Sequence, residues 1–375
     1  MRARDTHEAH RVATPLELLF DLCFVVAVAQ AAASLHHAIA AGHAGPGLLH
    51  FVQVFFAVWW AWMNFTWYAS AYDTDDVWYR LKVLVQMVGV LVLAAGVPRL
   101  SASGDGSIVT LGYAIMRVSL IACWLRAAAE DADPERARTA RRYAFGIAVC
   151  EVAWLAMLFL PRDTWGWVWF AMLPLELGVP IWAEKTGATT WHPHHIVERY
   201  SLMTLIVIGE SVLAATLAVQ AAVDGGSLSW LLGCVIAGAV LVLFSAWWIY
   251  FAEPPTFISH TNRWAFFWGY GHYFVFAALA AMGAGLAFAT DSVVGGGPHW
   301  IASAAVAIPI AVFLAAQWIF VIWKNRRGAG VNVAYGLAIA CVLGSIAIPV
   351  PALPVGVIMI ALTIATRGRA MPAHH

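Results

Sequence analysis

The chain has 375 residues, of which 62% are hydrophobic and only 11% are charged. Soluble domains carry about 25% charged residues, so this composition excludes an ordinary soluble protein and indicates a chain solvated mainly by lipid. The formal net charge is zero, which gives no electrostatic reason to expect a nucleic-acid partner.

Apolar runs long enough to cross a bilayer follow one another along the whole chain. Residues 1–14 are polar and carry no short apolar segment of the signal-peptide type, so we expect the first run to be a retained span. Breaks at Gly, Pro and charged residues divide the apolar runs into twelve predicted helices. They are 15–40, 47–71, 79–98, 107–129, 143–161, 164–184, 198–222, 228–252, 263–290, 299–323, 332–348 and 352–366. The sequence therefore predicts an all-α polytopic transmembrane bundle of about twelve spans.

The distribution of Lys and Arg predicts how this bundle is oriented. Cytoplasmic loops of membrane proteins carry an excess of these residues. With the N-terminus inside, nearly all of them fall on the cytoplasmic side, including Arg367 and Arg369 after the twelfth helix. We therefore expect a multi-pass protein of the cell membrane with both termini in the cytoplasm and the lipid bilayer as its principal partner.

The two halves of the chain resemble each other in the same direction. Glu17 opens the first predicted helix as Glu198 opens the seventh, and Trp67 and Trp248 end the second and eighth at the same offset. Parallel six-helix repeats occur in transporters, with the binding site at the repeat interface. This pattern predicts an N-terminal repeat at 1–190 and a C-terminal repeat at 191–375, forming one integral membrane unit.

Several segments carry a family resemblance. These are Thr14-Pro15-Leu16-Glu17-Leu18-Leu19-Phe20-Asp21-Leu22, Tyr72 to Asp76 with Arg80, Glu198-Arg199-Tyr200 through Gly209-Glu210-Ser211, and the helix of His272. Over essentially its whole length the chain resembles the bacterial low temperature requirement A family. The resemblance implies a bacterial inner-membrane protein but brings no firm biochemical activity, because the family is named after a growth phenotype.

Acidic residues open the first helix. Thr14-Pro15-Leu16-Glu17 has the form of a capping box with Pro at the first helical position. Asp21 lies one turn further on the same face, where two like charges repel. We therefore expect one of the two carboxyls to be protonated, or both to share a cation or an arginine.

Other ionisable residues fall in the middle of predicted spans. Glu210 and His272 lie near the bilayer midplane, where a titratable group is costly and is a functional candidate. We predict that Glu17, Asp21, Glu210 and His272 form a substrate or proton site, although capping alone is a sufficient role for Glu17 and core packing for His272.

A buried ion pair is expected between the fourth and fifth helices. Arg117 and Glu151 both lie about 13 Å from the cytoplasmic boundary on neighbouring helices. A structural ion pair is the preferred interpretation, with a substrate site as the alternative. Glu176, between Pro174 and Pro180, marks a broken sixth helix whose role is open.

Metal binding has only weak support. His192, His194, His195 and Glu198 precede the seventh helix, but no second carboxylate–histidine pair accompanies them. All five cysteines lie within apolar runs and have no metal-ligand spacing, which also makes disulfides unexpected. We predict no cofactor.

Asp73-Thr74-Asp75-Asp76 offers a different chemistry. It has the DxDD form of class II terpene cyclases, and it follows a helix rich in Trp and Phe that is suited to cation–π stabilisation. As catalytic residues, Asp73, Asp75 and Asp76 would act on an isoprenoid or lipid, and a divalent cation at these carboxylates belongs to this interpretation alone. The alternative is a helix cap in which Asp76 pairs with Arg80, with the aromatic residues in a membrane-interface belt.

Three functions remain open from the sequence. The preferred one is a solute transporter or proton-coupled carrier for a small molecule, followed by an intramembrane enzyme acting through the acidic motif. The third is an ion channel, because Phe20-Asp21 in a doubled six-span arrangement is similar to certain lysosomal-type potassium channels. No P-loop or dinucleotide fingerprint supports ATP-driven or nicotinamide chemistry.

Overall fold

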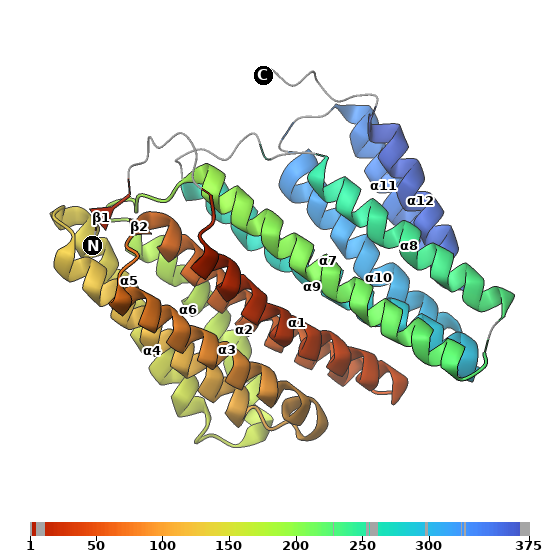
Figure 1. The fold of residues 1–375 in the computed structure, drawn as a ribbon, viewed down its shortest axis with the longest axis horizontal. Helices are drawn as coiled ribbons and strands as arrows, with labels where there is room; N and C mark the ends of the chain where they lie inside the picture. Colours follow the sequence, from red (N-terminus) through yellow and green to blue (C-terminus); the bar gives the residue numbers. More distant parts are fainter. Residues whose placement is uncertain are drawn as a thin grey trace. The chain divides into compact units, whose positions relative to one another are not determined.

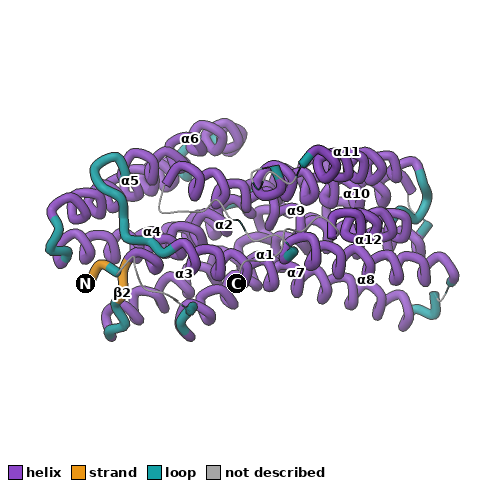
Figure 2. The backbone as a smooth tube through the Cα atoms, turned by 90° about the horizontal axis from the view of Figure 1, so that it is seen from above, coloured by secondary structure: helices purple, strands orange, loops and turns teal. Residues whose placement is uncertain are grey.

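The computed structural model describes residues 2–4, 12–227, 229–252, 255, 262–296, 299–323, 325 and 328–367. In this part of the chain, twelve α-helices joined by short connections account for nearly all of the structure (Figure 2). A short antiparallel pairing of β1 (Arg2–Ala3) with β2 (Tyr72–Asp73) is the exception. The predicted all-α bundle is therefore confirmed.

Most of these helices have the length and composition of membrane spans. Among the described residues, ten helices are long and apolar enough to cross a bilayer. Of the other two, α12 (Ala352–Arg367) is apolar but shorter, and α5 (Pro134–Met157) begins with several arginines. The chain is thus a multi-pass membrane protein, while the cytoplasmic placement of its termini stays a prediction.

The first compact unit comprises Met1–Ser34 and Pro46–Leu202. It holds most of α1 (Pro15–Ala40), the start of α7 (Pro193–Asp224) and the helices between them. These are α2 (Ala44–Ala71), α3 (Val77–Ser103), α4 (Ser107–Glu130), α5, η1 (Arg162–Thr164) and α6 (Trp165–Ala183). Successive helices pack side by side from α3 to α6 (Figure 1).

The helix α2 supplies the aromatic core of this unit. Trp59, Trp60, Trp62, Phe65 and Tyr68 are all almost completely buried. An interface belt would leave such side chains near the lipid headgroups. These five instead pack inside the protein, and their polar N–H and O–H groups therefore need partners there.

Two helices begin at least five residues before the starts that their apolar runs predict. In α5, the side chain of Asp133 accepts hydrogen bonds from the backbone N–H groups of Glu135 and Arg136, and Pro134 occupies the first helical position. This cap starts the helix nine residues before the predicted start at 143. In the same way, α7 begins at Pro193 rather than at 198, which brings the histidines before Glu198 into or beside the helix.

Close contact between α3 and α4 depends on glycine. A Cβ atom on Gly112 would lie 2.3 Å from the backbone nitrogen of Leu93 and 2.6 Å from the carbonyl oxygen of Gly89. Small residues at such a crossing let helix backbones approach within a membrane. The backbones of α3 and α4 are therefore in direct contact at Gly89 and Gly112.

The second compact unit comprises Leu35–Gly45 and Met203–His375. Its helices are α8 (Trp230–Phe251), α9 (Asn262–Gly295), α10 (His299–Gln317), α11 (Ala329–Gly344) and α12, with the π-helix η2 (Trp318–Ile322) and the 3₁₀ turn η3 (Ser345–Ala347). Within this unit α9 packs on α10 and α8 packs on α12 (Figure 1).

The chain passes from one unit to the other at three points, each of which lies within a helix. They fall between Ser34 and Leu35 of α1, between Gly45 and Pro46 at the start of α2, and between Leu202 and Met203 of α7. The predicted repeat of 1–190 and 191–375 stays a prediction, but α1 and α7 are helices that the two units share.

Candidate functional site

The N-terminal charge cluster comprises Glu17 and Asp21 of α1, His195 and Arg199 of α7, and Trp62 of α2. Arg199 donates from Nε to Asp21 Oδ2 at 3.0 Å and from Nη2 to Asp21 Oδ1 at 2.6 Å. The indole Nε1 of Trp62 donates to the same carboxylate at 2.7 Å. All these side chains are almost completely buried. Asp21 is therefore held by charged and neutral donors from two other helices.

Glu17 has a double role in this cluster. Its carboxylate accepts from the backbone N–H of Thr14 at 2.7 Å, and its own N–H donates to Thr14 Oγ1 at 3.3 Å, as in the predicted capping box. Its Oε1 also lies 3.2 Å from Arg199 Nη1 and 3.2 Å from His195 Nε2. The two carboxylates thus share one arginine, which is one of the arrangements expected from the sequence.

The ion pairs of this cluster include two carboxylates, one guanidinium and one imidazole, all of them buried. A carboxyl group and an imidazole can each gain or lose a proton, whereas the arginine stays charged. The two groups that meet at 3.2 Å, Glu17 and His195, are therefore suited to exchange and hold a proton.

A second buried cluster is centred on Glu176 of α6. Arg117 of α4 donates from Nη2 to Glu176 Oε2 at 2.6 Å, and Trp60 of α2 donates to the same oxygen at 2.7 Å. Trp154 of α5 and Tyr113 of α4 donate to Oε1 at 2.9 and 3.2 Å. We call these five residues the Glu176 cluster. A single carboxylate thus joins four helices of the first unit.

Arg117 pairs with Glu176 instead of Glu151, the partner predicted from the sequence. Glu151 is buried, and neither of its carboxylate oxygens has a hydrogen-bond partner among the described residues. The predicted depth fits Glu176 as well, because this residue lies seven residues before the end of α6, or about 11 Å. The predicted partner was wrong because the acid that bonds to Arg117 comes from α6 and not from the neighbouring helix α5.

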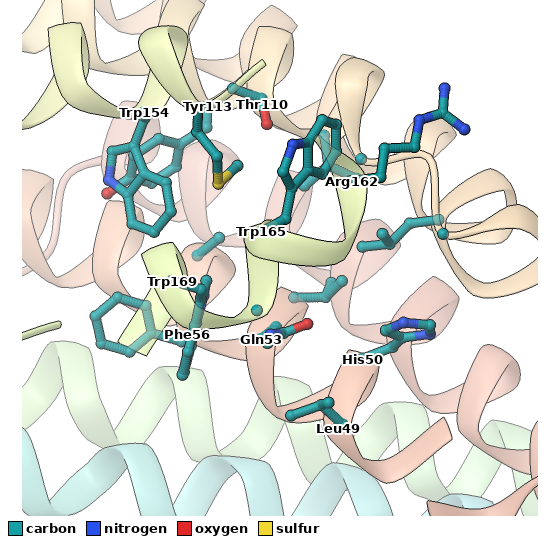
Figure 3. Close-up of a pocket in the computed structure, with 18 of the residues that line it drawn as sticks. Leu49, His50, Gln53, Phe56, Thr110, Tyr113, Trp154, Arg162, Trp165 and Trp169 are labelled. Carbon is teal, nitrogen blue, oxygen red and sulfur yellow. The ribbon is translucent and has the colours of Figure 1, made fainter. Parts of the chain in front are cut away.

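A cavity of about 420 Å³ lies beside the Glu176 cluster (Figure 3). Tyr113 and Trp154 line it while donating hydrogen bonds to Glu176. Phe56, Trp165 and Trp169 add further aromatic surface. Sequence patterns did not predict this cavity, because its lining residues are spaced over five α-helices, η1 and the loop between α3 and α4, and are mostly uncharged. The tryptophans that begin α6 were a signal that could have pointed to it.

In the second unit, His272 of α9 is completely buried. Its Nδ1 lies 2.8 Å from the carbonyl oxygen of Trp268, so this nitrogen carries the proton and donates. Its Nε2 lies 3.1 Å from the hydroxyl of Tyr250. Both ring nitrogens of His272 therefore have a hydrogen-bond partner, and these contacts are sufficient for a structural role.

Glu210 of α7 is also buried. Its neighbour Ser211 donates to the carbonyl oxygen of Leu279 at 2.8 Å, and a Cβ on Gly283 would lie 2.8 Å from Ser211 Cα. The small residue beside Glu210 therefore admits another helix, as expected. A common site of Glu210 and His272 with Asp21, which belongs to the first unit, stays a prediction.

The acidic motif after α2 is engaged in ion pairs. Asp75 accepts from Arg80 Nε at 2.7 Å and from Nη2 at 2.6 Å. Asp76 caps α3 by accepting from the N–H of Tyr79 at 2.8 Å, and it pairs with Arg126. The partner expected for Arg80 was Asp76, and the structure places Asp75 there. The side chain of Asp73 lies outside the described part of the chain.

These ion pairs fix the protonation of the motif. Hydrogen bonding to Arg126 holds the pKa of Asp76 well below its usual range, and hydrogen bonding to Arg80 lowers the pKa of Asp75. Both carboxyls are therefore ionised near neutral pH.

Comparison with known proteins agrees with the family resemblance of the sequence. The family model described as bacterial low temperature requirement A protein (LtrA) matches residues 12–366. The uncharacterized protein RA0937 of Rhizobium meliloti is 27% identical over 247 residues, which cover 63% of this chain and 58% of that relative. No solved structure matches.

Proposed function

The chain belongs to the bacterial low temperature requirement A family, and from this premise we propose that it is a proton-coupled carrier of a small solute across the membrane. The observation that carries the proposal is the N-terminal charge cluster, in which Glu17 and Asp21 share Arg199 and meet His195 inside a membrane protein. Ionisable groups buried within a membrane protein are costly to keep, and they mark proton relays and transport pathways.

Protonation of the cluster would change the contact between α1 and α7. When Glu17 is ionised, Arg199 bonds to both carboxylates. A proton on Glu17 removes the charge that holds Arg199 Nη1, and a proton on His195 strengthens the bond from His195 to Glu17. Because α1 and α7 are shared by both compact units, a proton-dependent contact between these helices is suited to control movements of the units. Glu210 and His272 are proposed as further titratable groups of the carrier.

The enzyme hypothesis receives less support from the geometry. A cyclase-type acid must hold a proton that it then delivers to the substrate. Asp75 and Asp76 are ionised by their arginine partners, which makes them suitable as helix-end ion pairs. No observation in the described residues favours a channel, so we propose neither alternative.

Reconstitution tests this function directly. The purified protein is placed in liposomes that contain a pH-sensitive dye, and solutes of cationic, neutral and anionic classes are added outside. A carrier is expected to move protons when its solute is added, and Glu17→Gln, which keeps the shape but not the charge, is expected to abolish that movement. Glu130→Gln at the exposed end of α4 serves as the control. Solute-driven proton movement that is unchanged in Glu17→Gln would contradict the proposal.

A further inference from the structure

The cavity beside Glu176 has the size and lining of a small-molecule site. Its volume of about 420 Å³ lies in the range of roughly 300–1,000 Å³ that is usual for ligand pockets. Aromatic side chains from α2, α4, α5 and α6 contribute to its wall: Phe56, Tyr113, Trp154, Trp165 and Trp169. Figure 3 shows Trp154, Tyr113, Trp169 and Phe56 gathered toward the same end of the cavity.

A buried ion pair lies behind this aromatic end, because Glu176 is bonded to Arg117, whose guanidinium lies 5.3 Å from the centroid of the Tyr113 ring. Tyr113 and Trp154 both donate to the carboxylate of Glu176, and Glu151 is a further buried acid close enough to act on Arg117. A hydroxyl or indole N–H that donates to a carboxylate makes its ring richer in electrons, which strengthens the attraction of the ring face for a cation. The cavity therefore presents π faces supported by acids.

The positive charges near the cavity are paired with acids. Among the described lining residues, Arg162 is the one with a permanent positive charge, and its side chain is 62% exposed. It lies 3.5 Å from Asp105, and in Figure 3 its guanidinium points away from Trp154 and Tyr113. Arg117, which does not line the cavity, forms an ion pair with Glu176. The pairing of both arginines with acids disfavours an anionic ligand at this end of the cavity.

We propose that this cavity binds a lipophilic organic cation, of the quaternary ammonium or phosphonium class, between the ring faces of Tyr113, Trp154 and Trp169. Recognition of quaternary cations by aromatic cages is an established use of cation–π attraction. The proposal names the solute class of the carrier and in that respect rests on the proposed function. Equilibrium binding tests the site without any transport, so the two can fail separately.

The experiment uses two ions of nearly the same shape and opposite charge. Binding of tetraphenylphosphonium and of tetraphenylborate to the full chain in lipid nanodiscs is measured by equilibrium dialysis, with empty nanodiscs subtracted. Saturable binding of the phosphonium without saturable binding of the borate is expected. Equal binding of both ions, or binding of the borate alone, would overturn the proposal, because it would show a merely apolar pocket or a pocket for anions.

Two tryptophans of α6 provide a matched pair of variants. Trp169→Ala removes a lining ring and is expected to weaken phosphonium binding roughly tenfold, whereas Trp169→Phe retains most of it. Trp167→Ala, two residues away and 79% exposed, should leave binding unchanged. Glu176→Gln should weaken binding without a change in the borate result. Unchanged binding in Trp169→Ala, or an equal loss in Trp167→Ala, would contradict the assignment.

Discussion

Arg199 of α7 holds Asp21 of α1 through two hydrogen bonds, from Nε at 3.0 Å and from Nη2 at 2.6 Å. A lysine keeps the charge but cannot reproduce this planar, two-point contact. Arg199→Lys is therefore expected to lower the thermal unfolding temperature in detergent and to impair proton-coupled flux. Arg80→Lys, which changes an exposed two-point contact with Asp75, is the control and should change neither. Equal effects of both substitutions would show that burial of the Asp21 pair has no special importance.

The Glu176 cluster makes a second prediction about stability. Arg117 and Glu176 are 1% and 0% exposed, so removing either partner leaves a buried charge, at a cost of about 3–5 kcal/mol. Arg117→Leu and Glu176→Leu should each lower stability strongly, and the double variant should lose much less than the sum. In contrast, Arg117→Leu and Glu151→Leu should show a weaker coupling. A double-mutant cycle by thermal unfolding decides between the two acids, and stronger coupling to Glu151 would refute the observed pairing.

The ion pair of Asp76 predicts a dependence on pH. Arg126 lowers the pKa of Asp76 in the folded protein below the unfolded value of 3.8. Such a carboxyl stabilises the fold at all pH values above the unfolded pKa, and this contribution is lost as the pH falls below it. Asp76→Asn should therefore lower the unfolding temperature at neutral pH and have a smaller effect at pH values well below 3.8. Asp163→Asn, at an exposed residue of η1, should have little effect at any pH. A pH-independent loss in Asp76→Asn would contradict the ion-pair account.

The acidic motif also separates the carrier from the enzyme. If Asp75 serves only as a partner of Arg80, Asp75→Asn should leave solute-driven proton flux essentially intact. Membranes supplied with prenyl diphosphates should yield no cyclised hydrocarbon in extracts, whether the protein carries Asp75 or Asn. Cyclised product from the wild type that disappears in Asp75→Asn would replace the carrier proposal with the enzyme.

Much of the fold follows from local sequence signals. The first helix begins at Pro15 and ends at Ala40 as predicted, because the Thr14–Glu17 capping box and an uninterrupted apolar run act on neighbouring residues. Helices with polar first turns, such as α5, start earlier than their apolar runs, because the Asp133 cap and not hydropathy sets their beginning.

The sites were less predictable because they join distant segments. The expectation that Glu17 and Asp21 share an arginine came from their repulsion, but the identity of Arg199 required the packing of α7 against α1. In the sequence, Glu176 stands out only because Pro174 and Pro180 flank it. Whether Arg117 pairs with Glu151 or with Glu176 depends on how α6 packs against α4. The aromatic cavity required five helices, from α2 to α6, to be placed together.

The most direct test of the central claim measures accumulation against an imposed pH gradient. Proteoliposomes with wild-type protein or Glu17→Gln receive radiolabelled tetraphenylphosphonium with the membrane potential clamped at zero by potassium and valinomycin. The proposed carrier predicts that wild-type liposomes accumulate the cation in proportion to the pH difference and release it when nigericin collapses that difference. It also predicts that Glu17→Gln binds the cation but does not accumulate it. Accumulation in Glu17→Gln equal to that of the wild type, or wild-type uptake that ignores the pH gradient, would contradict a proton-coupled carrier built on the Glu17–Asp21–His195–Arg199 cluster.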